Sequence, residues 1–414
     1  MAILRKKFLR LSDNVKENKC RMLNIKLVPA EYGDCLWISV CEDKTCNILI
    51  DGGTKKTYQN FIKTEIQHFK EVGQSLNLMI CTHMDYDHIG GLIEILKNED
   101  EKFIKNIWYN GLLQTVNSKY YSLPENEYST RDNKILDEII SKGVISNEEK
   151  EIGINEGMSL GVLIEDKKIP LNKVVGGKAL STEHISDVIK LERGIFIRIL
   201  GPSKENLERV ENVWKKEMIH RNYCFRISNK IKLTEAFEYQ LETIKLFYAN
   251  EKILVNQVEE LEKYMGNLDV VDNSETNGSS ISFILEYKDK KYLFLGDSII
   301  DESILNNIKK AVGYNYRFVA IKLPHHGSRY NISLDFIKRY SADEYYCLTN
   351  SERFGHPDLE VLATIICNDS RHKKLIFNYP ISKAQFLNKN EWKEKYNYEI
   401  IMGNGNHIIE RIFE

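Results

Sequence analysis

The sequence predicts an α/β fold in which helices cover layers of β-sheet. Short apolar runs alternate with stretches of helical periodicity along most of the chain, and several clusters of polar residues directly follow apolar runs. Strands that alternate with helices indicate helix-on-sheet layers. The 414 residues are 42% hydrophobic and 29% charged, which excludes a wholly disordered, collagen-like or disulfide-scaffold protein and allows a large core.

The first group of predicted elements lies between residues 23 and 110. Short alternating runs bounded by turn residues predict strands, and apolar residues at helical spacing from Tyr58 to Val72, followed by Gly73, predict a helix. In chain order we expect strands at 23–29, 35–41, 46–50, 76–81 and 103–109, with helices at 58–72 and 89–96.

Two segments interrupt this rhythm. Residues of about 112–192 are polar and rich in turn signals, with a strand-like fragment at 162–164. Residues 204–265 contain neither Pro nor Gly and predict a helical hairpin, broken near residues 222–229 and packed on the domain as an insertion. Between them, 194–200 reads as a strand that Gly201-Pro202 closes.

The alternation of strands and helices returns after residue 280. We expect strands at 280–287, 292–295, 318–323, 345–348 and 374–378, with helices at 300–312 and 359–367. The predicted organisation is a basic N-terminal arm at 1–22 and one domain at 23–414, with insertions at about 112–192 and 203–270.

Charge and cysteine usage predict a cytoplasmic protein that does not associate with membranes. The net charge is −2, from 58 basic and 60 acidic residues, so no global bias toward nucleic acid exists. No apolar run approaches the ~18 residues of a membrane span, and the N-terminus lacks the apolar segment of a signal peptide. The eight cysteines form no Cys-x-x-Cys pair, and we expect them to be reduced thiols.

The strongest chemical signal is a run of four potential metal ligands, His83-x-Asp85-x-Asp87-His88, between a buried strand and a helix. Imidazole nitrogen and carboxylate oxygen together suit Zn²⁺ or Mn²⁺. Three further clusters follow apolar runs: Gly296-Asp297, His325-His326 and Gly355-His356. Five of the ten histidines lie in these four clusters, which together predict a metal centre.

The order of these motifs resembles the metallo-β-lactamase fold superfamily of hydrolases, and its nearest branch is similar to the soluble metallo-hydrolase domain of the ComEC competence proteins. The resemblance covers about residues 23–110, 193–202 and 277–380. The motifs that carry it are, in chain order, Gly33-Asp34-Cys35, Ile50-Asp51-Gly52-Gly53, His83-x-Asp85-x-Asp87-His88-Ile89-Gly90-Gly91, Asn277 with Ser280, Gly296-Asp297, Pro324-His325-His326-Gly327-Ser328 and Gly355-His356-Pro357.

The resemblance implies an αββα metallo-β-lactamase-like sandwich with a large helical insertion and two divalent metal ions at one edge of the sheets. It implies the following ligands: His83 and Asp85 for the first metal, Asp87 and His88 for the second, Asp297 between both, and one of His325 or His326, with His325 favoured, to complete the second site. Asp51 would orient the loop through hydrogen bonds.

Two positions depart from the commoner pattern of the superfamily. Asp85 stands where a second histidine is usual, and the third histidine has no clear match. Asn277 is the best-placed substitute and His184 a poor one. An aspartate and an asparagine make the first site harder, so Zn²⁺ or Mn²⁺ is expected, with Mg²⁺ as a further candidate.

The implied reaction is hydrolysis by a hydroxide that two metals activate. Asp87 would help to orient the hydroxide, while His326 and His356 would bind a phosphate oxygen or protonate the leaving group. Ser328 has two readings, as a donor to the same anion or as a residue that stabilises the turn.

Three hypotheses concern the substrate. The first is a phosphodiesterase or nuclease acting on DNA or RNA, to which the basic stretch from Lys215 to Lys232 would bind through Lys215, Lys216 and Arg221. The second is a hydrolase of a small phosphoester, cyclic nucleotide or lactone. The third is an effector subunit, for example in phage defence, that a partner protein activates through the insertion at 203–270.

Overall fold

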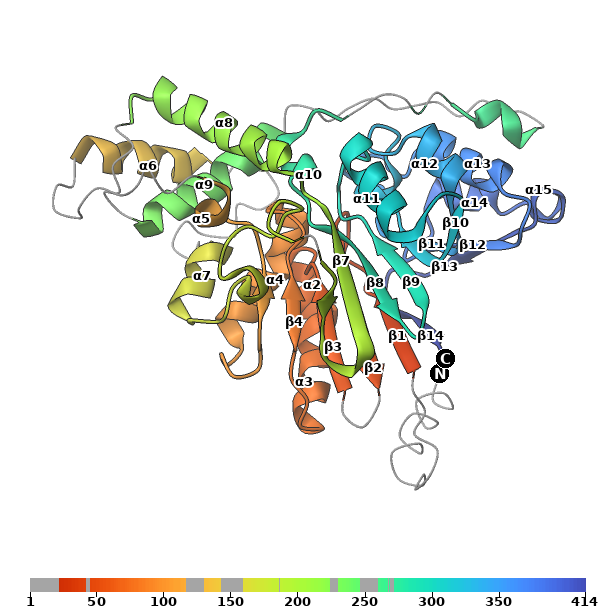
Figure 1. Cartoon of the computed structure of the whole chain (residues 1–414), viewed down its shortest axis with the longest axis horizontal. Helices are drawn as coiled ribbons and strands as arrows, with labels where there is room; N and C mark the ends of the chain where they lie inside the picture. The colour runs from red at the N-terminus through yellow and green to blue at the C-terminus, as the bar shows by residue number, and fades with distance from the viewer. Residues whose placement is uncertain are drawn as a thin grey trace.

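In the computed structural model two β-sheets lie face to face, with helices on both outer sides (Figure 1). The structure describes residues 22–41, 45–116, 130–142, 159–185, 187–223, 230–245, 260–266, 268 and 272–414. The predicted basic arm lies outside these residues except for Met22. The described residues contain no helix that is both long and apolar enough to cross a membrane.

The first sheet has six strands, five from the first part of the chain and one from its end. In spatial order they are β14 (Ile409–Phe413), β1 (Met22–Leu27), β2 (Leu36–Cys41), β3 (Thr45–Ile50), β4 (Leu78–Ile80) and β5 (Ile107–Trp108). Strands β14, β1, β2 and β3 pair with one another in antiparallel fashion. Strands β3, β4 and β5 pair in parallel. The carboxyl ends of β3 and β4 therefore meet at one edge.

The second sheet has eight strands, in the order β13 (Tyr398–Met402), β12 (Lys373–Phe377), β11 (Tyr340–Cys347), β10 (Tyr316–Lys322), β9 (Lys290–Phe294), β8 (Ser282–Tyr287), β7 (Ile195–Gly201) and β6 (Ile189–Lys190). Strands β9 to β13 are parallel and β6 to β9 antiparallel. Lys288 and Asp289 make the tight β8–β9 turn with positive φ angles of 49° and 62°. The carboxyl ends of β9 and β10 meet at one edge of this sheet.

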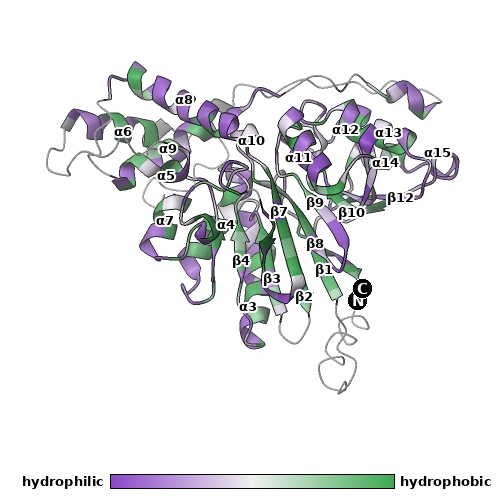
Figure 2. Ribbon diagram, viewed as in Figure 1, coloured by the Kyte–Doolittle hydropathy of each residue, from purple (hydrophilic) through white to green (hydrophobic). Residues whose placement is uncertain are grey.

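Three hydrophobic clusters hold these layers together. One fills the space between the sheets, with Ile25 and Ile38 on one side and Phe283 and Phe294 on the other. The other two lie on the outer faces, between each sheet and its helices. Apolar residues are concentrated on the strands, whereas the helices carry many hydrophilic residues (Figure 2). The predicted sandwich of two sheets between helical layers is therefore confirmed.

The helices divide between the two outer faces. The first sheet is accompanied by α2 (Lys55–Thr57), the π-helical turn η1 (Tyr58–Ile62), α3 (Lys63–Glu71) and α4 (Tyr86–Asn98). The chain around the second sheet contains α10 (Glu275–Gly278), α11 (Glu302–Val312), α12 (Leu334–Arg339), α13 (Leu359–Asn368), α14 (Ser382–Leu387), α15 (Asn390–Tyr396) and the short 3₁₀ turns η5 (Glu192–Gly194), η6 (Leu261–Tyr264) and η7 (Pro324–Gly327).

The two segments predicted to be insertions pack against each other in a helical lobe beside α4 (Figure 1). The first contributes α5 (Leu112–Thr115), α6 (Thr130–Lys142), α7 (Leu160–Asp166) and η4 (Lys173–Val175), and the second contributes α8 (Lys204–His220) and α9 (Lys230–Lys245). Helix α9 contacts both α6 and α7, and α8 contacts α10. The predicted break within 204–265 coincides partly with Arg221 to Tyr223, where α8 ends.

Some predicted elements differ from the observed ones. The strand-like fragment at 162–164 is wrong, because Ser159 caps a helix there and its hydroxyl accepts a hydrogen bond from Val162 N. Helix α4 begins at Tyr86 rather than Ile89, so Asp87 and His88 lie on its first turn. Strand β11 begins five residues earlier than expected, at Tyr340.

Candidate metal centre

Four loops that follow parallel strands converge where the two sheets meet. Asp51 follows β3, His83 follows β4, Asp297 follows β9, and His325 and His326 follow β10. A backbone hydrogen bond from His325 N to Gly296 O connects two of these loops, and another from Ile281 N to Thr82 O joins the loop after β4 to the start of β8. Neighbouring parallel strands present their carboxyl ends at the same edge, so the clusters recognised in the sequence come together there.

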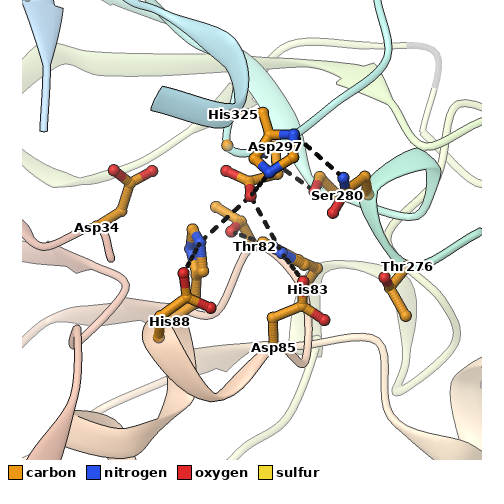
Figure 3. Close-up of polar contacts among 12 residues, drawn as sticks. Asp34, Thr82, His83, Asp85, His88, Thr276, Ser280, Asp297 and His325 are labelled. Atoms are coloured by element: carbon orange, nitrogen blue, oxygen red, sulfur yellow. Dashed lines mark hydrogen bonds and ion pairs between the residues drawn. The ribbon is translucent and has the colours of Figure 1, made fainter. Parts of the chain in front are cut away.

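One carboxylate oxygen lies at the centre of this arrangement. Asp297 Oδ2 is 3.7 Å from His83 Nε2, 3.5 Å from His88 Nε2, 3.7 Å from His325 Nε2 and 3.9 Å from His326 Nε2. Figure 3 shows His325 on one side of Asp297, and His83 and His88 on the other. Asp297, His83 and His88 are almost completely buried, so these contacts are shielded from bulk water.

The rings of His83 and His88 are held from behind by Asp51. Asp51 Oδ2 lies 2.9 Å from His88 Nδ1 and accepts a 2.7 Å hydrogen bond from Thr82 Oγ1, which itself lies 3.1 Å from His83 Nδ1. The other carboxylate oxygen accepts from Thr82 N at 2.8 Å. With each Nδ1 donating to an oxygen, each Nε2 presents a lone pair to the centre.

The two consecutive histidines are oriented in the same way. His325 Nδ1 lies 2.9 Å from the Asn331 side-chain oxygen, and His326 Nδ1 lies 2.7 Å from Leu348 O. His325 and His326 have positive φ angles of 43° and 54°, an uncommon conformation for residues other than glycine. Both histidines therefore adopt an energetically unfavourable backbone conformation, and they do so where both rings turn toward Asp297.

The donor set fits a divalent metal ion. The Nε2 atoms of His88 and His326 are buried and have no hydrogen-bond partner among the described residues. His83 Nε2 lies 3.0 Å from Asp85 Oδ2, a contact between two acceptors unless a proton or a cation lies between them. Among the described residues, three sets of ligand atoms are close enough to share an ion: those of His83, His88 and Asp297, those of Asp87, His88 and His326, and those of Asp34, Asp51 and His88.

When no metal is bound, the carboxylates favour the protonated form of two imidazoles, those of His88 and His326. Burial alone would lower the pKa of His88, but Asp297 and Asp51 outweigh it and raise that pKa well above its usual value. Burial also opposes a charged His326, while Asp34 and Asp297 raise its pKa to about 9. Burial would raise the pKa of Asp297, yet the surrounding imidazoles hold it well below its usual value. A bound metal would replace these protons.

The structure brings both His325 and His326 to Asp297, where the sequence left a choice that favoured His325. His326 Nε2 lies 3.8 Å from Asp87 Oδ2 and belongs to the group of Asp87 and His88. The His325 ring lies on the side of Asn277, whose amide nitrogen is 3.3 Å from His325 Nδ1. This geometry favours His326 as the companion of Asp87 and His88.

Asn277 is a buried residue beside His325. Its amide nitrogen donates to Asp272 Oδ2 at 2.5 Å, while its side-chain oxygen is buried and has no hydrogen-bond partner among the described residues. That oxygen is therefore available to a cation or a substrate. His184, the other substitute weighed from the sequence, is exposed and contacts Ser181, so it lies elsewhere.

His356 and Ser328 both lie next to His325. The His356 ring stands edge-on to His325 with 4.9 Å between ring centroids, and its Nδ1 is 3.4 Å from Asp358 Oδ2. Ser328 Oγ accepts a 3.2 Å hydrogen bond from Tyr330 N. Of the two roles considered for Ser328, this contact supports the turn-stabilising one.

The basic residues expected to bind substrate lie on or just after α8. Lys215 pairs with Glu211 at 2.8 Å and Arg221 pairs with Glu217 at 2.5 Å, while Lys216 is on the same helix. Each of these two pairs joins residues one helical turn apart, which reduces the net positive charge that this segment offers to phosphate groups.

Two charged residues in the centre were missed as site residues. Lys322 and Asp34 form an ion pair, and both are at most 2% exposed. Gly33-Asp34-Cys35 was noticed as a motif without a role, whereas Lys322 was hidden in the apolar run of β10. A lysine among strand residues, three positions before His325, was the available signal, because a lysine is rarely buried unless it is paired.

The family comparison supports the architecture around this site. Residues 30–106 match the family model of the metallo-beta-lactamase superfamily. The two facing sheets with outer helices agree with the fold of that superfamily. A search of curated proteins finds no match.

Solved structures similar to this chain include three proteins of low sequence identity. The metallo-beta-lactamase fold protein YhfI from Bacillus subtilis is 8% identical, with 94% of this chain and 100% of that chain covered and a TM-score of 0.35. Zn(2+)-bound PqqB from Methylobacterium extorquens is 9% identical, with 94% and 99% covered and a TM-score of 0.38. A long form RNase Z from yeast is 14% identical, with 96% and 42% covered and a TM-score of 0.32.

Proposed function

We propose that this chain, whose fold and residues 30–106 agree with the metallo-beta-lactamase superfamily of metal-dependent hydrolases, cleaves phosphodiester bonds with two divalent metal ions. The observation that carries the proposal is the convergence of four imidazole Nε2 atoms on Asp297 Oδ2, all within 3.9 Å. Every one of these rings has its Nδ1 within 3.1 Å of an oxygen behind it.

The proposed ligands divide into two groups that share Asp297. His83, Asp85 and His325 would hold one ion with Asp297, and Asp87, His88 and His326 would hold the other. Compared with the expectation from the sequence, His326 replaces His325 in the second group. Two ions bound here would lower the pKa of a water molecule and offset negative charge on an attacked phosphoryl group.

The remaining residues would orient the ligands and handle a proton. Asp51, Thr82, Asn331 and Leu348 O fix the ring orientations through the hydrogen bonds at Nδ1. His356, which lies beside His325, would protonate the leaving oxygen, and Asp358 near its Nδ1 would keep the ring oriented.

The chemistry of the ligands supports a phosphodiester substrate. Asp85, Asp87 and Asp297 make the site rich in hard oxygen donors, which suit Mn²⁺ and Mg²⁺ as well as Zn²⁺. Such ions favour hard phosphoryl oxygens. Two metals that share a carboxylate can stabilise both the attacking and the leaving oxygen of an in-line displacement.

A small phosphodiester, such as a cyclic nucleotide or a dinucleotide, is the second candidate substrate. The ion pairs of Lys215 and Arg221 favour it, because they reduce the positive charge with which α8 could bind a long nucleic acid. The nucleic-acid hypothesis would regain support if charge on α8 affected cleavage of long substrates.

The test combines metal analysis with a length series of substrates. Purified protein should bind two equivalents of Mn²⁺ or Zn²⁺ and hydrolyse at least one phosphodiester among a dinucleotide, a cyclic nucleotide, single-stranded and double-stranded DNA, and RNA. If the substrate is a long nucleic acid, Lys215→Glu with Lys216→Glu should weaken cleavage of long strands and reduce its salt dependence, whereas cleavage of a small phosphodiester should not change. Metal binding without cleavage of any phosphodiester would contradict the proposed substrate class, and a lactone assay would then follow.

A further inference from the structure

The ammonium group of Lys322 lies inside the metal centre. Its side chain is 2% exposed at the end of β10, and its Nζ donates a 2.9 Å hydrogen bond to Gly296 O. The same nitrogen forms an ion pair with Asp34 and lies 3.8 Å from Asp297 Oδ1. The two carboxylate oxygens of Asp297 therefore have different surroundings: Oδ2 faces the four imidazoles, and Oδ1 faces the ammonium group of Lys322.

Asp34 connects Lys322 to a second member of the centre. Its Oδ2 contacts Lys322, and its Oδ1 lies 3.2 Å from His326 Nδ1, the ring nitrogen that also donates to Leu348 O. The backbone on both sides of Asp34 is held as well, because Asp34 N donates to Asp87 O and Gly53 N donates to Asp34 O. The Asp34–Lys322 pair thus touches residues of the second proposed ligand group from two directions.

The charges of the centre indicate why a fixed cation is useful there. Five carboxylates in it are at most 3% exposed: Asp34, Asp51, Asp85, Asp87 and Asp297. Their five negative charges equal the sum of four positive charges from two divalent ions and one from Lys322. Lys322 thereby provides the fifth positive charge, because imidazole ligands are neutral and do not balance the carboxylates.

We propose that Lys322 and Asp34 are positioning residues that fix Asp297 and His326 for the second metal ion, an inference that rests on the metal centre of the proposed function. Lys322 keeps Asp297 Oδ1 turned away from the imidazoles, so that Oδ2 is the oxygen offered to the metal. Asp34 keeps the Nδ1 side of His326 occupied, so that Nε2 faces Asp87. Outer residues of this kind typically contribute about 10–100-fold to metal affinity.

A single substitution of Lys322 or of Asp34 would not separate an effect on metal affinity from an effect on the stability of the fold. Lys322→Met leaves the Asp34 carboxylate buried without its cation, and Asp34→Asn leaves the ammonium in the same state, so both are expected to destabilise the fold. Lys322→Met combined with Asp34→Asn removes both charges, keeps a polar group near His326 Nδ1 and is expected to recover most of the stability.

The experiment titrates metal-free protein with Mn²⁺ and with Zn²⁺ by calorimetry and measures thermal unfolding without metal. We expect the double variant to unfold near the wild-type temperature and to bind the first ion normally. Its affinity for the second ion should fall about 10–100-fold. If the double variant does not fold, Lys322→Gln with Asp34→Asn keeps a donor to Gly296 O and replaces it in the same titration.

A matched control is Lys373→Met, because Lys373 is also fully buried and donates to Ile366 O and Tyr396 O away from the centre. This control should lose stability and keep wild-type affinity for both ions. A folded double variant with wild-type affinity for both ions would overturn the inference and leave the pair a purely structural one. Wild type that binds no metal would instead overturn the proposed function.

Discussion

Asp87 is a buried side chain at this site that we expect to serve metal binding rather than folding. It lies on the first turn of α4, is 3% exposed, and faces His326 Nε2 at 3.8 Å. Its backbone carbonyl accepts from Asp34 N, an interaction that a side-chain substitution retains. The carboxylate adds negative charge to a cluster that already contains Asp85 and Asp297, and in the absence of metal a protonated His326 beside it offsets part of the resulting repulsion.

Asp87→Asn is expected to separate metal binding from folding. The amide has the same size and removes both the repulsion from Asp85 and Asp297 and the attraction to a protonated His326, so the melting temperature of the metal-free variant should stay close to that of wild type. Added Mn²⁺ should raise the melting temperature of wild type more than that of the variant, because only the native state of wild type binds both ions tightly. Differential scanning fluorimetry with and without Mn²⁺ measures both effects.

The control for this substitution is Glu94→Gln, on the same helix and paired with Lys97 outside the centre. It should respond to Mn²⁺ as wild type does. An equal Mn²⁺-induced shift in Asp87→Asn and wild type would show that Asp87 does not bind the metal.

At the scale of elements, close backbone contact fixes α4 against the loop after β3. Gly52 N donates to His88 O at 2.8 Å, and Gly91 N donates to Gly53 O at 3.0 Å. A Cβ on Gly91 would lie 2.0 Å from Gly52 O, so any other residue there would force the helix away from the loop. The glycines that follow His88 in the sequence therefore hold the His88 ring at its hydrogen-bond distance from Asp51.

A buried glutamate connects the helical lobe to the first sheet. Glu238 on α9 accepts hydrogen bonds from Tyr109 Oη at 2.8 Å, from Leu160 N at 3.0 Å and from Gly161 N at 3.0 Å. These donors favour the carboxylate, but burial has the larger effect and raises its pKa from 4.5 to about 7. The chain immediately after β5, helix α7 and helix α9 thus meet at one ionisable group.

This raised pKa predicts how stability depends on pH. Between about pH 4.5 and pH 7 the folded protein holds a proton on Glu238 that the unfolded chain has released. The contribution of Glu238 to the free energy of unfolding is therefore complete below about pH 4.5 and is lost as the pH rises through about 7. In Glu238→Gln the contribution does not change with pH. Relative to this variant, the unfolding free energy of wild type should fall by on the order of 3 kcal/mol from pH 4.5 to pH 8.

Urea denaturation at several pH values measures this difference. Glu138→Gln, at an exposed position on the neighbouring helix α6, is the control and should follow wild type throughout. A difference between wild type and Glu238→Gln that stays constant over this range would contradict the raised pKa.

On the scale of the whole molecule, β14 closes the sandwich after the chain has completed the second sheet. It pairs with β1 along Leu23 to Leu27, which covers an edge that would otherwise be open to other strands. Arg411 on β14 reaches across to Glu344 on β11 of the opposite sheet, and Phe413 packs edge-on against Tyr292. Contacts between the two ends of the chain therefore hold the sheets, and the centre between them, in register.

Arg411→Met is expected to weaken this closure. Glu344 is 5% exposed and would lose its charged donor, and leaving a buried carboxylate in this state costs about 1–3 kcal/mol. Arg371→Met, which removes an arginine that is 57% exposed and pairs with Asp369, should change stability by less than about 0.5 kcal/mol. Chemical denaturation of the metal-free proteins compares them, and equal losses would argue against a role of the Arg411 pair in closing the sandwich.

The alternation of elements could be predicted from the sequence because it is a local property. Apolar runs such as those ending at Ile50, Cys81 and Leu295 are visible without a partner strand, and so are the histidines and aspartates that follow them. The ends of parallel strands must share an edge, so the meeting of these clusters was also predictable. The strands β13 and β14 and the helices α14 and α15 were not expected from the sequence.

Tertiary structure alone decided the features that depend on contacts between distant residues. The sequence predicted that Asp297 and the His325-His326 pair belong to one site, but whether both rings face Asp297 depends on the backbone φ angles and on Asn331 and Leu348 O behind them. Lys322 looked like one polar residue in an apolar strand, because its partner Asp34 is 288 positions away in the chain. Burial and charge balance are properties of the folded whole, and a local pattern does not contain them.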